Sequence, residues 1–134
     1  MKKVFQAQLD KLDDVLSFTD EELEKLDCPM KSKLSVDVAL EEVFVNVANY
    51  AYRGMDGFAE VEVDGSSEPG CVRIRLSDSG KQFNPLARED PDVTKPAEER
   101  NIGGLGIFMT KKMMDNVEYE YKDGKNILTL TKYL

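Results

Sequence analysis

Residues 59–78 read AEVEVDGSSEPGCVRIRLSD and hold the pattern that decides the fold. Before the glycine-bounded turn, apolar residues alternate with Glu and Asp, and after it they alternate with Arg. Such alternation is typical of a strand with one buried face, and opposite charges on neighbouring strands favour antiparallel pairing. The segment therefore predicts a β-hairpin with one face in the core and one face in water.

Apolar periodicity predicts the other elements as well. Asp123-Gly124 is a two-residue turn signal between two alternating segments. A capping-box pattern that begins at Thr19 leaves open whether the first helix is one helix or two. The expected elements, in chain order, are a strand over 3–9, helices over 10–26 and 30–52, a hairpin over 59–76, a helix over 104–115 and a hairpin over 117–133.

Two hairpins with segregated helices predict an α+β fold: a two-layer sandwich with a mainly antiparallel sheet and about three helices on one face. A chain of 134 residues suits a single domain over 1–134. Between the two hairpins, residues 79–102 contain three prolines and little periodicity, which is typical of a functional loop.

Composition excludes several classes of function. The net charge of −8 argues against nonspecific nucleic-acid binding, which depends on Lys and Arg. No segment approaches the roughly 20 apolar residues of a membrane span, and no leader pattern is evident, so we expect a cytoplasmic protein. The chain has no histidine, which excludes a Ser-His-Asp triad, an HExxH zinc site and a phosphohistidine on this chain.

The long helix carries the first chemical candidate, Glu42 and Asn46, which are four residues apart and face the same way. An amide oxygen can ligate a hard cation while a nearby carboxylate acts as a base. The alternative is that both side chains lie at the solvent edge of the helix.

Asp78 is the second candidate, because it continues the inward face of its strand, where a carboxylate needs a partner or a ligand. It would accept a hydrogen bond from an exocyclic amine such as that of adenine, and Gly80 would allow close approach. The alternative is a turn that ends the strand.

Gly103, Gly104 and Gly106 form the third candidate, a glycine cluster at the start of a helix. Exposed backbone N–H groups there favour a phosphate, and the alternative is ordinary helix capping. The pattern is neither a dinucleotide-binding fingerprint nor a Walker A loop.

Together these motifs closely resemble the GHKL (histidine-kinase-like, Bergerat-fold) ATP-binding domains, and among them the small anti-sigma-factor serine/threonine kinases. The matching segments are Glu42-x-x-x-Asn46 with Ala51-Tyr52, Asp78-x-Gly80 with Phe83-Asn84-Pro85, and Gly103-Gly104-Leu105-Gly106. The tail also fits, with Met114-Asp115-Asn116-Val117-x-Tyr119 and Gly124-x-Asn126-x-Leu128. One departure is Tyr50, because many relatives have histidine before the Ala-Tyr pair.

The resemblance implies ATP and Mg²⁺ as cofactors, with Asn46 as the Mg²⁺ ligand and residues 86–102 as a lid. It implies that Glu42 is the catalytic residue, which acts as a general base on the acceptor or orients it. The implied nucleotide-binding residues are Asn46, Asn49, Asp78, Gly80, Phe83, Gly103, Gly104, Leu105 and Gly106.

It further implies a homodimer whose partners are an anti-anti-sigma (STAS) protein, phosphorylated on serine, and a sigma factor. Two alternatives remain open from the sequence: a nucleotide-dependent protein-binding regulator without kinase activity, and the ATP-binding half of a split sensor kinase.

Overall fold

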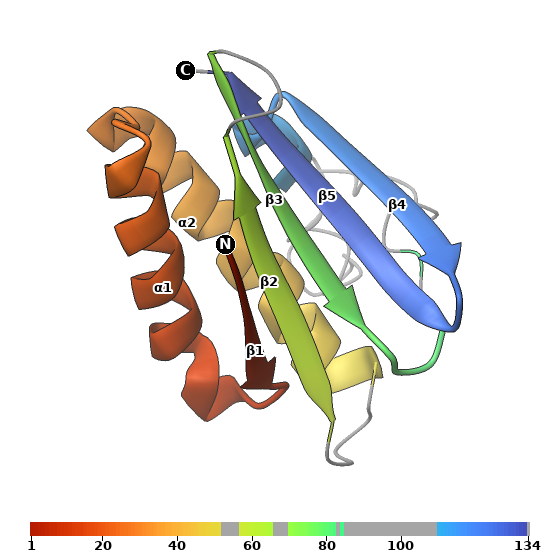
Figure 1. The fold of residues 1–134 in the computed structure, drawn as a ribbon. Helices are drawn as coiled ribbons and strands as arrows, with labels where there is room; N and C mark the ends of the chain where they lie inside the picture. The colour runs from red at the N-terminus through yellow and green to blue at the C-terminus, as the bar shows by residue number, and fades with distance from the viewer. Residues whose placement is uncertain (52–56, 66–69, 83, 85–109, 134) are drawn as a thin grey trace, which may run out of the picture.

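We analysed a computed structural model of the chain, which describes residues 1–51, 57–65, 70–82, 84 and 110–133. The described strands form one five-stranded sheet in the order β1-β2-β3-β5-β4, and every neighbouring pair is antiparallel. Helices α1 and α2 lie on one side of this sheet (Figure 1). The predicted α+β, two-layer class is confirmed. The strands are β1 (Lys2–Gln6), β2 (Phe58–Asp64), β3 (Cys71–Asp78), β4 (Asn116–Lys122) and β5 (Lys125–Tyr133).

The central hairpin pairs as its charge pattern predicted. Glu62 of β2 lies opposite Arg75 of β3, and their side chains form an ion pair of 3.3 Å on the open face of the sheet. On the other face, the alternating apolar residues are buried. The second hairpin turns at Asp123 and Gly124, which both have positive φ, as expected for a two-residue turn.

Strand β1 is shorter than the expected 3–9. Its last pair joins Gln6 to Phe58, the first residue of β2, so the sheet offers no further partner on that side. The chain turns there instead, with the backbone N–H of Ala7 bonded to the carbonyl of Gly57, and a 3₁₀ turn (η1, Leu9–Lys11) follows.

The first helix is a single helix, α1 (Leu12–Lys25). Thr19, which sequence reasoning placed at a possible second start, lies in mid-helix and is fully buried. Its hydroxyl donates a 2.9 Å hydrogen bond to the carbonyl of Val15, four residues earlier, and so does not cap a new helix.

The second helix, α2 (Met30–Asn46), contributes large side chains to the core. Phe44 and Leu40 are fully buried and belong to the same apolar cluster as Ile74 of β3 and Leu130 of β5. The helix continues as a π-helical turn, η2 (Val47–Ala51), which accounts for most of the expected extension toward Tyr52. The core therefore lies between α2 and the centre of the sheet.

Residues 110–113 are helical and lead into β4, within the last helix expected from the sequence. This short piece is tied to β5: the Lys132 ammonium donates to the carbonyl of Met113, and the backbone N–H of Tyr133 donates to Asp115 Oδ2. Thr110, the first residue of this piece, and Met114, which directly follows it, are both buried. In the described part of the chain, no helix is long and apolar enough to cross a membrane.

Candidate functional site

Asp78 is the last residue of β3, and its position in the strand register turns its side chain toward the helical layer, as predicted. The residue is only 5% exposed. Oδ1 accepts hydrogen bonds from the backbone N–H of Gly80 and from Asn126 Nδ2, both at 2.9 Å. Burial raises the pKa of Asp78, and these two hydrogen bonds oppose the rise without cancelling it.

The bond from Gly80 shows that the strand-ending turn, left open by the sequence, is present. An Asp that accepts a hydrogen bond from the backbone two residues later forms an Asx turn. This turn uses only Oδ1, and within the described residues Oδ2 receives no hydrogen bond. The turn and a ligand contact are therefore compatible, because they use different oxygens of one carboxyl group.

Asn126 belongs to a segment that fits the resemblance, but the sequence assigned it no role at the site. It is the second residue of β5, pairs directly with Asp78 across the β3–β5 ladder and is only 6% exposed. Its position was the available signal, since Leu128 and Leu130 follow it on the same inward face. A polar residue at the first inward position of a strand needs a partner, and here that partner is Asp78.

Glu42 and Asn46 lie in the C-terminal part of α2, and both residues are half-buried. Figure 1 shows the C-terminal end of α2 toward the same end of the molecule as the end of β3. The π-helical turn begins directly after Asn46 and contains Asn49, which is exposed. Single π-helical turns are rare and occur frequently at functional sites, so this interruption marks the segment as a candidate.

The remaining predicted site residues lie outside the described residues. They are Phe83, Gly103, Gly104, Leu105 and Gly106, together with the predicted lid at 86–102. Their roles stay predictions.

The described residues are compatible with a metal ion that binds together with a nucleotide, whose phosphates would supply further ligands. They contain no group of three or more Asp, Glu, Cys or His side chains placed to hold an ion. Asn46 provides one neutral amide oxygen. Mg²⁺ in nucleotide sites usually keeps several waters and takes the rest of its ligands from one or two side chains and the phosphates. One amide ligand is compatible with that coordination.

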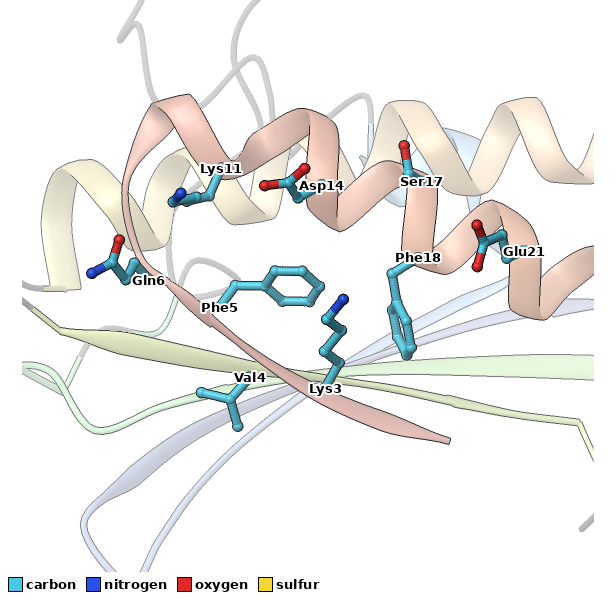
Figure 2. Close-up of a pocket in the computed structure, with 9 residues that line it drawn as sticks. All are labelled: Lys3, Val4, Phe5, Gln6, Lys11, Asp14, Ser17, Phe18 and Glu21. Atoms are coloured by element: carbon cyan, nitrogen blue, oxygen red, sulfur yellow. The ribbon is translucent and has the colours of Figure 1, made fainter.

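A separate cavity of about 540 Å³ lies between β1 and α1 (Figure 2). Two aromatic rings form its inner wall: Phe5 and Phe18 meet edge to face with centroids 5.9 Å apart, and the Lys3 ammonium lies 5.4 Å from the Phe5 ring. None of the predicted site residues lines it. The lining residues are Lys3, Val4, Phe5, Gln6, Lys11, Asp14, Ser17, Phe18 and Glu21.

Comparison with known families gives a match over nearly the whole chain. A model of the histidine kinase-like ATPase domain matches residues 5–132. The chain belongs to this family. The resemblance drawn from Glu42, Asn46, Asp78 and the glycine cluster is therefore confirmed at the level of the family.

Two relatives of known name are serine-protein kinases. The serine-protein kinase RsbW of Listeria monocytogenes serotype 4a (strain HCC23) is 31% identical over 101 residues, which are 72% of this chain and 63% of the relative. RsbW of Bacillus thuringiensis (strain Al Hakam) is 27% identical over 101 residues, or 72% of this chain and 61% of the relative. The match thus spans somewhat less than two thirds of these relatives.

Solved structures support the fold. The RsbU and RsbW domains of Rv1364c from Mycobacterium tuberculosis align with a TM-score of 0.64 at 16% identity, covering 100% of this chain and 32% of that chain. The histidine kinase domain of Erythrobacter litoralis EL346 aligns with a TM-score of 0.54 at 13% identity, covering 92% of this chain and 61% of that chain.

Proposed function

We propose that this protein is an ATP-dependent protein kinase that phosphorylates a serine of an anti-anti-sigma (STAS) protein and also binds a sigma factor. Membership of an ATPase family and relatives that are serine-protein kinases support this proposal. The observation that carries it is the buried carboxyl group of Asp78, held by one oxygen at a strand end. We expect the protein to act in the cytoplasm as a homodimer.

Adenine recognition follows from the chemistry of Asp78. The exocyclic amine of adenine is a donor, and an ionised carboxylate is only an acceptor. Oδ1 is already engaged by Gly80 and Asn126, so the amine would donate to Oδ2. A hydrogen bond to a buried charged acceptor is stronger than one to a neutral group, which makes this contact the main determinant of base binding.

The phosphates would be held at the other end of the nucleotide. Asn46 would ligate Mg²⁺, which would supply positive charge to the phosphates, and the backbone N–H groups of Gly104 and Gly106 would bind phosphate oxygens. Catalysis of phosphoryl transfer depends mainly on such positioning and charge neutralisation.

Glu42 lies one helical turn before Asn46 and would act on the acceptor serine. The serine oxygen attacks the γ-phosphorus, the bond between that phosphorus and the β–γ bridging oxygen breaks, and ADP leaves. The serine proton passes to the Glu42 carboxylate and from there to water. Because the sequence contains no histidine, the acceptor cannot be a histidine of this chain.

The test uses radiolabelled ATP and the cognate STAS protein. We expect Glu42→Ala to reduce transfer about 10²–10⁴-fold while ATP binding persists, because only the proton acceptor is lost. Glu41→Ala is the matched control, since Glu41 is the adjacent, exposed carboxylate of the same helix. Transfer that survives intact in Glu42→Ala would show that Glu42 is not the base.

Nucleotide binding is measured separately. Asp78→Asn should weaken ATP binding by tenfold or more, since an acceptor is exchanged for a group that can present its own N–H to the amine. If Asp78→Asn bound ATP as tightly as the wild type, the assignment of the whole nucleotide site would be wrong. Stable complexes with a partner but no transfer in the wild type would instead indicate a nucleotide-dependent binding protein.

A further inference from the structure

Three side chains from three strands form a hydrogen-bonded line that ends at the proposed nucleotide site. The Tyr119 hydroxyl of β4 donates to Asn126 Oδ1 at 2.6 Å. Asn126 Nδ2 of β5 donates to Asp78 Oδ1 at 2.9 Å and also to the carbonyl of Lys81 at 2.9 Å. Asn126 therefore joins the end of β3 to the loop that follows it.

The chemistry of its neighbours determines how the Asn126 amide is turned. The Asp78 carboxylate and the Lys81 carbonyl are acceptors only, so the amino group must face them. The amide oxygen must then face Tyr119, whose hydroxyl can donate. A flipped amide would place its oxygen against two acceptors and would leave buried groups unpaired, which is costly.

This arrangement decides what Asp78 can offer to a ligand. Both described donors, Asn126 and the Gly80 backbone, reach Oδ1. Both also favour the charged form and so keep the pKa of Asp78 lower than burial alone would. Asp78 must be charged to act purely as an acceptor, because a protonated carboxyl group would present a donor to the amine.

We propose that Asn126 is a positioning residue for base selection: it fixes Asp78 Oδ1 and the loop at Lys81, so that Oδ2 is presented as an acceptor to an adenine amine. The proposal rests on the proposed nucleotide site at Asp78. Guanine carries a carbonyl oxygen at the same ring position, and that acceptor would be opposed by Oδ2. Loss of Asn126 should therefore weaken adenine binding and reduce discrimination against guanine.

The test measures dissociation constants of ADP and GDP for the full chain across pH 5.5–8.5. Asn126→Leu keeps the branching and the number of side-chain heavy atoms and removes every side-chain hydrogen bond. We expect ADP to bind about tenfold more weakly and the preference for ADP over GDP to become smaller. We also expect the loss of ADP binding on acidification to begin at a higher pH than in the wild type. Asn116→Leu is the control, because Asn116 is an exposed residue of β4 on the open face of the sheet.

A second variant keeps the proposal testable if Asn126→Leu fails to fold. Tyr119→Phe removes only the hydroxyl that donates to the Asn126 amide oxygen, and we expect a smaller change in the same three measurements. ADP binding and pH profiles like those of the wild type in folded variants would overturn the proposal. If Asp78→Asn also left ADP binding unchanged, the assignment of the nucleotide site itself would be wrong. If ADP binding weakened in Asp78→Asn but not in the Asn126 and Tyr119 variants, only the role of Asn126 would be refuted.

Discussion

Two carboxyl groups meet in the interface between α1 and α2, and we expect them to make the stability of the protein depend on pH. Asp20 Oδ1 and Asp37 Oδ1 are both buried, and neither has a hydrogen-bond partner when both groups are ionised. A proton on Asp37 allows it to donate to Asp20. Burial, this hydrogen bond and the charge of Asp20 raise the pKa of Asp37 to about 7, and nearby Lys33 opposes the rise.

The sign follows from the direction of this change. The folded state binds a proton that the unfolded chain, with an ordinary Asp pKa of 3.8, releases. The stabilising contribution is therefore complete below about pH 4 and is lost as the pH rises through 7. Each pKa unit corresponds to about 1.4 kcal/mol, but Asp37 is only half-buried and solvent screens it. We expect the free energy of unfolding to fall by about 1–2 kcal/mol between pH 5 and pH 8.5.

Asp37→Asn removes this dependence, because the Asn amide donates to Asp20 at every pH. Urea unfolding followed by circular dichroism should show similar stability of variant and wild type at pH 5, and a variant more stable by about 1–2 kcal/mol at pH 8.5. Glu41→Gln is the control, since it makes the same change in net charge at an exposed position of α2. Equal stability of Asp37→Asn and wild type at pH 8.5, or the same gain in Glu41→Gln, would refute the reasoning.

Three further substitutions test the fold through the same urea titration. Phe44→Ala should cost about 3–5 kcal/mol, because Phe44 is fully buried in the core, and a loss below 1 kcal/mol would contradict its assignment as a central core residue. Gly124→Ala should cost about 1–2 kcal/mol, because φ is +76° in the hairpin turn; no loss would mean that the turn is different. Arg75→Ala should cost less than about 1 kcal/mol despite its 3.3 Å ion pair with Glu62, since this pair is exposed, and a larger loss would show that the pair is shielded from solvent.

The sequence predicted both hairpins because their signals are local. Alternation determines which face of a strand is buried, and Asp123-Gly124 determines where the second hairpin turns. The inward position of Asp78 followed from the same counting. Counting could not place the end of β1, because that end depends on where β2 begins.

Helix details were less accessible from the sequence. The pattern at Thr19 has the residue types of a helix cap, but a residue caps a helix only where the helix begins. Here α1 is continuous through Thr19, whose side chain is buried in the core. The sequence pattern predicted an uninterrupted helix over 30–52 and gave no indication of the π-helical turn after Asn46. Both features depend on how the helix meets the sheet rather than on local propensity.

The sequence by itself determined the order of the elements, the two-layer class and the resemblance of its motifs to an ATPase family. These features could be predicted because periodicity and short motifs depend on residues that are close together in the chain. Only the tertiary structure decided which polar groups meet. Asp78 and Asn126 are 48 residues apart, and Asp20 and Asp37 belong to different helices. A buried polar group takes the partner that the packed chain brings within hydrogen-bond reach, and that partner is determined by the register of strands and the contact between helices.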